Sequence, residues 1–151
     1  MLLRSRADIG REAWDAFCLA HPHAWFLWTS GYLDYQAARG VRELSFGIVE
    51  PKIREYPHLG ISASNEGDDR LLAISPLLVE EQDGTRCFTM EGHPIPAALT
   101  EAYADEGDLP SRYAVARRIN AEVERVAGEQ GVLYGKWRFP CCSRPISDEP
   151  R

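Results

Sequence analysis

Long apolar stretches are absent from this 151-residue chain, and so is any excess of positive charge. The N-terminus becomes charged at Arg4, which leaves no apolar segment of the kind that forms a secretory signal. The longest apolar runs, 24–28 and 71–74, are far too short to span a bilayer. Lys plus Arg number 17 against 23 Asp plus Glu, a formal net charge of −6, which argues against general nucleic-acid binding through phosphates. We therefore expect a cytoplasmic protein with no membrane span.

Cysteine and metal-binding patterns are also scarce. The chain has four cysteines, with no C-x-x-C pair among them: Cys18, Cys87, Cys141 and Cys142. The adjacent last two can hardly bridge to each other, so we expect free thiols, with Cys87 buried and inert in a strand. His21 and His23 form an H-x-H pair, but no third ligand lies at a convincing spacing. We predict no metal site.

Several enzyme signatures are missing as well: a G-x-S-x-G nucleophile elbow, a Walker loop and a dinucleotide-binding fingerprint. Apolar residues make up 44% and charged residues 26% of the chain, close to the average for globular proteins. The length suits one domain. We predict a single domain over residues 1–140 and a polar tail over residues 141–151.

The first half of the chain alternates between helical and extended patterns. Asp8 is the expected cap of a helix over about residues 10–20, and Thr29 and Ser30 cap a second helix that Gly40 ends. The aromatic segment 25–28 between them is expected to be extended. Residues 44–49 alternate with a period of two, which predicts a strand. Residues 51–69 are expected to form a long loop with a short strand at 59–61.

The second half adds a hairpin, a helix and a last strand. A strand over 70–80 contains Pro76, which indicates a bulge or an edge, and Asp83-Gly84 turns the chain into a strand over 86–90. Residues 91–96 are expected to be a rigid irregular loop, 108–130 a helix and 132–139 a strand. The apolar stripe of that helix is predicted to contain Tyr113, Ala116, Ile119, Val123 and Val126. The order ααβββαβ indicates an α+β fold in which helices flank a mixed sheet with a central β-hairpin.

Three stretches of the chain carry a resemblance to a known family: Trp14-Asp-Ala-Phe, Ala24-Trp-Phe-Leu-Trp-Thr-Ser and Leu71-Leu-Ala-Ile-Ser-Pro-Leu. With the order of elements, they resemble the first half of bacterial FemAB-like N-acyltransferases, relatives of the peptidoglycan-bridge aminoacyl transferases. The likeness extends from about Asp8 to Pro140. The resemblance implies a GNAT-like fold. Members of this family contain two domains of that fold in tandem. The second domain generally holds the donor, and the first helps to shape the acceptor cleft.

The resemblance also implies an acyl-CoA or aminoacyl-tRNA donor and an amine-bearing acceptor. Related enzymes bind the pyrophosphate of acyl-CoA with backbone N–H groups of a loop whose position is occupied here by residues 91–96. Pro94 and Pro96 have no N–H to offer, and Glu91 repels phosphate. We therefore expect that this chain binds no cofactor alone. It would be the acceptor-side half of an enzyme, completed by a second acyltransferase half or by a homodimer.

The candidate substrate-binding residues are Tyr32, Tyr35, Glu91 and His93, and no catalytic residue is predicted. Histidine side chains can accept a proton near neutral pH, so His93 could act as a base, although a plain loop residue is the simpler interpretation. In some members of the family, a lysine binds the phosphates of the acceptor. It stands shortly after the aromatic residue of the second helix. Gln36 stands there, and a neutral amide cannot supply the charge of a lysine.

Two other functions stay open. The chain could be a non-catalytic protein-interaction module with a degenerate acetyltransferase fold, which would bind its partner through the aromatic segment 25–28. It could also be a complete small acetyltransferase with an unusual donor loop. Trp25 and Trp28 could stack on a sugar or a base, but packing is the favoured role of both.

Overall fold

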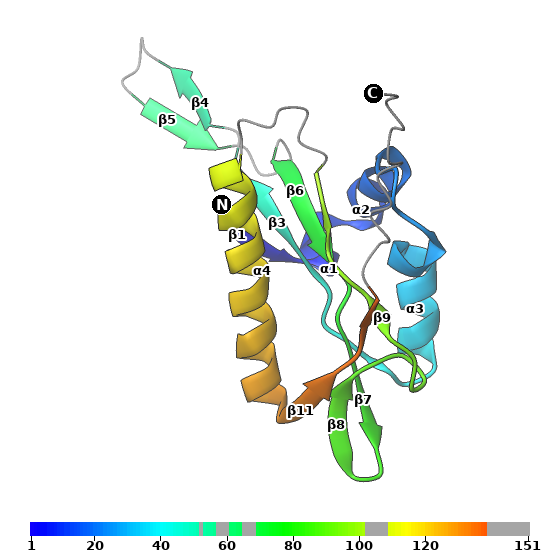
Figure 1. The fold of residues 1–151 in the computed structure, drawn as a ribbon. Coiled ribbons are helices and arrows are strands. Elements are labelled where there is room, and N and C mark those ends of the chain that lie inside the picture. The colour runs from blue at the N-terminus through cyan, green and yellow to red at the C-terminus, as the bar shows by residue number, and fades with distance from the viewer. Residues whose placement is uncertain (52, 57–60, 65–68, 102–108, 139–151) are drawn as a thin grey trace, which may run out of the picture.

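The chain folds into an α+β structure, seen in a computed structural model that describes residues 1–51, 53–56, 61–64, 69–101 and 109–138 (Figure 1). Within these ranges it has four α-helices and a short 3₁₀ turn: α1 Arg6–Ile9, α2 Arg11–Ala20, η1 Phe26–Trp28, α3 Ser30–Ala38 and α4 Leu109–Gln130. The strands are β1 Leu2–Ser5, β2 Arg42–Glu43, β3 Phe46–Glu50, β4 Ile53–Tyr56, β5 Ile61–Ser64, β6 Arg70–Ser75, β7 Leu78–Gln82, β8 Thr85–Phe88, β9 Ile95–Pro96, β10 Leu99–Thr100, β11 Val132–Gly135 and β12 Trp137–Arg138.

Most of the strands belong to two four-stranded sheets. The first has the order β1-β3-β6-β10 and is antiparallel throughout. The second has the order β11-β8-β7-β2, in which β11 runs parallel to β8 and the other neighbours are antiparallel. The chain passes directly from the first sheet to the second between β6 and β7, which are separated only by Pro76 and Leu77. The strand expected over 70–80 breaks there. The missing N–H of Pro76 accounts for this break.

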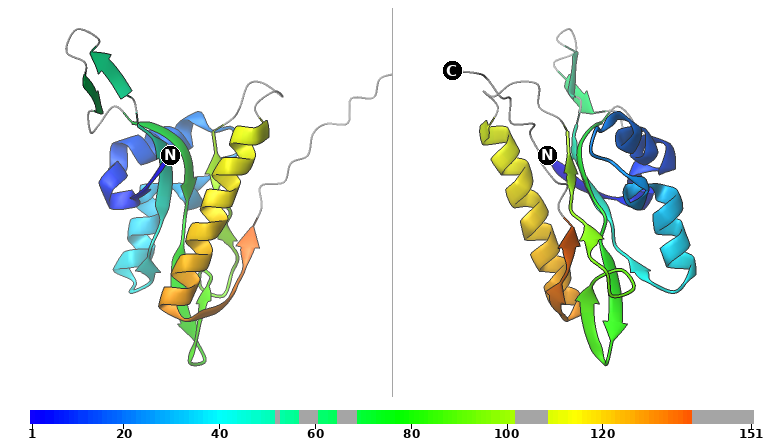
Figure 2. Two further views of the ribbon diagram at one scale, coloured as in Figure 1. Left: turned by 90° about the vertical axis from the view of Figure 1, so that its left-hand side faces the viewer. Right: turned by 45° about the vertical axis from the view of Figure 1, so that its right-hand side comes forward.

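The helices lie on opposite sides of the strands, with α2 and α3 on one side and α4 on the other (Figure 2). The core between them includes Trp14, Leu33, Ile48, Ile74 and Leu78, each with almost no exposed surface. Two indole N–H groups bind backbone carbonyls there. Trp14 Nε1 donates to Trp28 O at 2.7 Å and Trp28 Nε1 to Ala97 O at 2.8 Å. Packing, not ligand stacking, is therefore the role of Trp28.

The buried stripe of α4 differs from the predicted one. Ile119 and Val126 are buried as expected, but Val115 is also buried and Tyr113 is largely exposed. Ala116 is exposed, and Val123 is partly buried against the core. The prediction was therefore right for Ile119, Val123 and Val126 and wrong for Tyr113 and Ala116, because α4 has apolar residues along two adjacent lines of its surface.

Three other expectations for the first half of the chain are corrected. A strand, β1, precedes the first helix and pairs with β3. The aromatic segment 25–28 forms a 3₁₀ turn, not an extended run. The expected loop over 51–69 contains the antiparallel pair β4 and β5, although residues 59 and 60 of its expected short strand lie outside the described residues.

Later in the chain, the Asp83-Gly84 turn is confirmed, with φ values of 52° and 74°. The expected irregular loop 91–96 is only partly irregular, since Ile95 and Pro96 form β9. Cys18 and Cys87 are buried free thiols, whereas Cys141, Cys142 and the whole predicted tail over 141–151 lie outside the described residues. Among the helices described, none combines the length and the apolar character that crossing a membrane requires.

Candidate functional site

Helix α3 and the turn that follows β8 lie side by side and bring predicted site residues together. We call Trp25, Phe26, Tyr32 and Tyr35, together with the turn Met90–His93, the aromatic ledge. Neighbouring rings are in contact along it: the ring centroids are 4.8 Å apart for Trp25 and Phe26, 5.2 Å for Phe26 and Tyr32, and 6.2 Å for Tyr32 and Tyr35. The first two pairs meet edge to face, the arrangement that aromatic quadrupoles favour.

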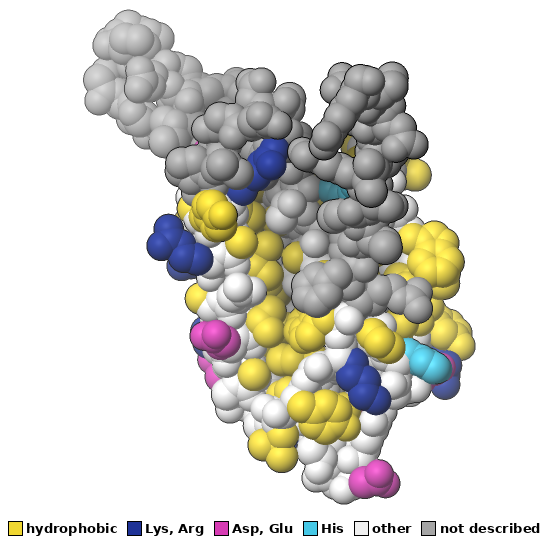
Figure 3. Space-filling view, in the orientation of Figure 1, with side chains coloured by type: hydrophobic (Ala, Val, Ile, Leu, Met, Phe, Trp, Pro, Cys, Tyr) yellow, Lys and Arg dark blue, Asp and Glu magenta, His cyan; other side chains and the backbone are white. Residues whose placement is uncertain are grey.

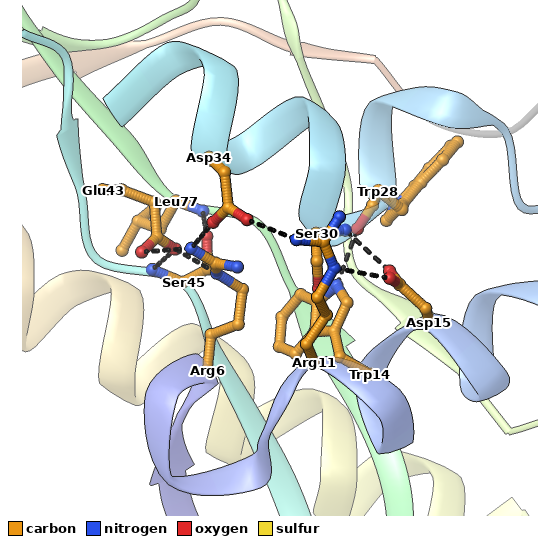
Figure 4. A network of polar contacts seen from close by, with 10 residues as sticks. All are labelled: Arg6, Arg11, Trp14, Asp15, Trp28, Ser30, Asp34, Glu43, Ser45 and Leu77. Atoms are coloured by element: carbon orange, nitrogen blue, oxygen red, sulfur yellow. Dashed lines mark hydrogen bonds and ion pairs between the residues drawn. The ribbon is translucent and has the colours of Figure 1, made fainter. Parts of the chain in front are cut away.

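A side chain of α2 fixes the start of α3. Thr29 precedes the helix but makes no side-chain cap. Instead, Asp15 accepts a hydrogen bond from Ser30 N at 2.7 Å (Figure 4). A carboxylate at this end also complements the positive end of the helix dipole. The position of α3, and with it the aromatic ledge, is therefore set by the preceding helix.

The turn Met90–His93 is tightly constrained. Met90 and His93 exchange two backbone hydrogen bonds of 2.9 and 2.7 Å. Glu91 and Gly92 between them have φ values of 50° and 76°, as in the two-residue turns that close β-hairpins. A glutamate in this left-handed region is uncommon. Glu91 N donates to Glu80 Oε1 at 2.6 Å, and Lys136 Nζ donates to Gly92 O at 2.9 Å, so β7 and the link between β11 and β12 both hold the turn.

Arg39 connects two of the predicted site residues. It forms an ion pair with the Glu91 carboxylate and donates a hydrogen bond of 3.1 Å to the Tyr35 hydroxyl. Its guanidinium carbon also lies 5.4 Å from the centroid of the Tyr35 ring, within the range of a cation–π contact. Tyr35 and Glu91 thus hold one cation between them. All three side chains are exposed.

Tyr32 lies deeper and has a structural role. Its hydroxyl accepts a hydrogen bond from Gln36 Nε2 at 2.8 Å and donates to Met90 Sδ at 2.8 Å. It therefore joins α3 to the turn. Gln36 is buried, so its amide serves this internal contact and does not face an acceptor.

His93 is in the turn but is not connected to the other three residues through its side chain. Its backbone pairs with Met90, and its carbonyl accepts a hydrogen bond from Thr89 Oγ1 at 2.7 Å. The imidazole is exposed. The structure thus brings together Tyr32, Tyr35 and Glu91, and leaves His93 beside them. Sequence reasoning missed Arg39, whose one signal is its position four residues after Tyr35 on a helix.

A polar network lies on the same side of the molecule, where α1, α3 and β2 meet (Figure 4). Arg6 Nη2 donates to Asp34 Oδ1 at 2.7 Å, and Arg6 Nε lies 3.3 Å from Glu43 Oε1. Burial alone would lower the pKa of Arg6, but the hydrogen bonds and charges of these two carboxylates outweigh it and raise the pKa. The Arg6 side chain is only 15% exposed. We assign this network to stability.

A groove of about 520 Å³ lies on the opposite side, between α4 and strands β6, β10 and β12. Its walls are mostly apolar, and Ser75 lies at its floor. The Ser75 side chain is 1% exposed, and its hydroxyl has no hydrogen-bond partner among the described residues. No sequence motif pointed to this groove, because its lining residues come from distant parts of the chain. They are Ser75, Ala97, Ala98, Thr100, Ala116, Ile119, Asn120, Val123, Glu124 and Trp137.

Both histidines of the pair 21 and 23 take part in hydrogen bonds of the fold. Over the described ranges, no three His, Cys, Asp or Glu side chains gather in a way that could hold a metal ion. His21 Nε2 lies 2.7 Å from Thr100 O, and its Nδ1 accepts a hydrogen bond from His23 N at 3.2 Å. His21 thus links the end of α2 to β10.

Comparisons with protein-family models, with curated proteins and with solved structures found no match to this chain.

Proposed function

We propose that this chain is the acceptor-side half of a FemAB-like N-acyltransferase with a GNAT-like fold, which holds an amine while a second polypeptide supplies the acyl or aminoacyl donor. The architecture supports this proposal. The hairpin β7–β8 lies inside a mixed sheet, in which β11 follows α4 and runs parallel to β8, and helices lie on both sides of the strands (Figure 2). This arrangement agrees with the fold class predicted from the sequence, in which helices flank a mixed sheet with a central β-hairpin.

The observation that carries the proposal is the cation held by Tyr35 and Glu91. A carboxylate beside an aromatic face is the arrangement that attracts an ammonium group. Arg39 occupies this place now, and its contacts are exposed. Exposed ion pairs stabilise by only about 0.2–1 kcal/mol, so an amine of the acceptor can replace the guanidinium at small cost.

Direct transfer is the mechanism that suits such a site. The bound ammonium first gives one proton to a nearby base, for which His93 is available. The neutral nitrogen then attacks the thioester or ester carbonyl of the donor, and the C–N bond forms as the C–S or C–O bond breaks. The second proton passes from the nitrogen to the sulfur or oxygen of the leaving group. Positioning and stabilisation of the carbonyl oxygen supply most of the rate. The aromatic ledge would supply the positioning of the amine.

The amine site is tested with Nα-acetyl-lysine amide, a primary amine, followed by NMR titration of the protein. Its matched control is the same compound with the side-chain amine acetylated, which removes the charge. We expect the charged probe to shift resonances of Tyr35 and Glu91. We also expect the Arg39→Ala variant to bind this probe more tightly than the wild type, because the competing cation is gone. Adding Glu91→Gln to Arg39→Ala should abolish binding. Equal binding of both probes, or no binding to Arg39→Ala, contradicts the proposal.

The donor half is tested by calorimetric titration of the chain with acetyl-CoA and with one long-chain acyl-CoA. We expect no saturable binding, because Glu91, Pro94 and Pro96 stand where backbone N–H groups would hold the pyrophosphate. Saturable binding at micromolar strength would place the donor site within these 151 residues. It would favour a complete small acetyltransferase instead.

A second candidate function is a non-catalytic interaction module. One observation favours it: Trp25 is 56% and Phe26 is 49% exposed, although aromatic residues of this size are more often largely buried. Under this alternative, Trp25→Ala abolishes binding of a partner protein and leaves binding of the amine probe unchanged. The acceptor-half proposal expects the probe to respond to Arg39 and Glu91.

A further inference from the structure

The groove between α4 and strands β6, β10 and β12 has the size of a small-molecule site. Its volume is about 520 Å³, and ligand sites in proteins usually measure ~300–1,000 Å³. At the ~30 Å³ that one water molecule occupies in the liquid, the groove has room for on the order of 15 non-hydrogen atoms. Figure 3 shows hydrophobic side chains gathered beside α4 on this face. The groove therefore suits a small molecule with a largely apolar body.

Contacts within the fold hold the walls of the groove in place. Trp28 Nε1 donates to the carbonyl oxygen of Ala97 at 2.8 Å, and His21 Nε2 lies 2.7 Å from that of Thr100. The ring of Trp137 packs against the core, with its centroid 5.9 Å from that of Phe88. The groove is thus formed before any ligand enters it, as most ligand sites are.

Ser75 gives the groove a buried polar group without a partner. Ser75 is 1% exposed, and its hydroxyl makes no hydrogen bond within the described part of the chain. It pairs with Phe46 across the sheet, and Phe46 lines a second cavity together with Val126 of α4. Directly opposed residues of two strands project to the same face, so the side chain of Ser75 points toward α4 and into the groove that it lines. A buried hydroxyl costs free energy until it is bonded, which favours a ligand that bonds to it.

The charges around the groove restrict the ligand further. Glu124, on α4, is the one charged residue among the described residues that line it. A carboxylate or a phosphate of a ligand is repelled by Glu124 and meets no cation in this lining. At the buried floor, any charged group would exchange its water shell for the neutral hydroxyl of Ser75 alone. A hydroxyl both donates and accepts, so Ser75 suits an uncharged hydroxyl or carbonyl group.

We propose that this groove binds a neutral, mainly aliphatic molecule whose single hydroxyl or carbonyl group forms a hydrogen bond with Ser75. The apolar body of the ligand lies along α4 and against Trp137. From Ala116 to Glu124 the helix rises about 12 Å, which gives an aliphatic chain a wall to follow. The groove lies on the other side of the strands from the aromatic ledge, so this site is separate from the proposed amine site.

The test is an NMR titration of the full chain, followed at its methyl groups, with 1-octanol as the neutral probe. Octanoate, with the same chain length, is the charged probe. We expect 1-octanol to cause saturable shifts at the methyl groups of Ala116 and Val123, and octanoate to bind roughly tenfold more weakly. Ser75→Ala should bind 1-octanol about fivefold more weakly than the wild type, because one neutral hydrogen bond is lost.

A matched pair of variants in α4 locates the binding. Ala116 and Ala121 are both exposed, and of the two only Ala116 lines the groove. Leucine favours a helix nearly as well as alanine, so Ala116→Leu and Ala121→Leu should both fold. We expect Ala116→Leu to weaken binding of 1-octanol roughly tenfold, because the added side chain occupies the space of the ligand. Ala121→Leu should bind as the wild type does.

Four results would overturn the proposal. If 1-octanol causes no saturable shifts up to its solubility limit, the groove is no such site. If Ala116→Leu binds as well as Ala121→Leu, the probe binds elsewhere. If Ser75→Ala binds as tightly as the wild type, the hydroxyl does not hold the ligand, and if octanoate binds as well as 1-octanol, the groove does not select a neutral molecule. None of these results depends on the amine site, so the outcome is independent of the tests of acyl transfer.

Discussion

At the scale of single residues, two buried serines on neighbouring strand segments differ in one respect. The hydroxyl of Ser45 accepts a hydrogen bond from Leu77 N at 3.0 Å, whereas that of Ser75 has no partner among the described residues. A buried hydroxyl without a partner costs about 1–3 kcal/mol, and so does an amide that loses its acceptor. We expect Ser45→Ala to destabilise the protein by about 1–3 kcal/mol, and Ser75→Ala to be neutral or stabilising by about 1 kcal/mol.

Urea unfolding of both variants measures the two free energies. Both variants remove a buried hydroxyl, one just before β3 and one at the end of the paired strand β6, so their opposite signs depend on the hydrogen bond. Destabilisation by Ser75→Ala as large as by Ser45→Ala would show that the Ser75 hydroxyl has a partner after all.

Burial of Cys18 makes a second residue-scale prediction, this time for alkaline pH. Burial, and secondly the charge of Asp15, raise the pKa of the Cys18 thiol from its ordinary 9.0 to about 12. Between these values the unfolded chain has lost the proton and the folded protein retains it. Stability is therefore fully present below about pH 9 and falls as pH rises toward 12.

The slope that Cys18 adds is at most about 1.4 kcal/mol per pH unit, the value for one proton. We expect the free energy of unfolding of Cys18→Ala to fall less steeply than that of the wild type above pH 9. Denaturant unfolding at several alkaline pH values measures both slopes. Equal slopes for the wild type and Cys18→Ala would mean that the Cys18 thiol loses its proton over the same pH range in the folded and the unfolded protein.

The sequence could indicate Tyr32, Tyr35 and Glu91 because they lie in segments of recognisable type, a capped helix and a loop with Gly and Pro. It could not indicate Arg39. An arginine at the end of a helix is ordinary, and its partner Glu91 is 52 positions away in the chain. The contact depends on how β8 ends beside α3, which is a property of the tertiary fold.

At the scale of elements, local signals predicted helices α2 and α3 and the Asp83-Gly84 turn well. Each ends at a residue with a clear conformational preference. The expected cap of the first helix was wrong, because Asp8 lies inside the additional short helix α1, where it completes the capping box of Ser5, and Gly10 precedes α2 without a side-chain cap. β1 was missed because its residues Leu2–Ser5 contain two polar side chains and no turn signal. It forms through pairing with β3, a long-range contact that local propensity does not encode.

Gly47 shows how closely α1 packs on the first sheet. A methyl group added there would lie 2.6 Å from Ile9 Cδ1, 2.9 Å from Leu71 Cδ1 and 3.0 Å from the carbonyl oxygen of Ala73. The side chains can move, but Ala73 belongs to β6, which pairs with β3. We expect Gly47→Ala to destabilise by about 1–3 kcal/mol through overpacking.

The control for this variant is Gly128→Ala in α4, where an added methyl group meets nothing within 4 Å. This substitution should stabilise by about 0.5–1 kcal/mol, because alanine favours the helix. Thermal unfolding of both variants gives the comparison. If both substitutions changed the free energy of unfolding by the same amount and in the same direction, the close approach at Gly47 would not affect stability.

At the scale of the whole molecule, the two sides of the strands carry different surfaces. One side carries the aromatic ledge, where we propose that the acceptor amine binds, and the other carries the apolar groove between α4 and strands β6, β10 and β12. The predicted site residues lie on the first side alone. The second side became visible only in the fold, because strands and a helix from distant parts of the chain line the groove.

Arg6 connects three elements that form the first of these sides, and its removal should weaken the molecule as a unit. It lies in α1 and binds Asp34 of α3 and Glu43 before β3. Glu43 is only 16% exposed. A carboxylate left there without its cation costs several kcal/mol when fully buried, and less here because water reaches part of the site. We expect Arg6→Gln to destabilise by about 2 kcal/mol.

Arg11→Gln is the matched control, since Arg11 also approaches Asp34, at 3.5 Å, but is 67% exposed. Exposed pairs of this kind contribute at most about 1 kcal/mol, so this variant should change stability little. The measurement is urea unfolding followed by tryptophan fluorescence and by circular dichroism. Coincident curves for Arg6→Gln, shifted to lower urea, would show that α1, α3 and β2 unfold together with the core. Separate curves would show instead that Arg6 holds only a local contact, because α3 would then leave the sheet first.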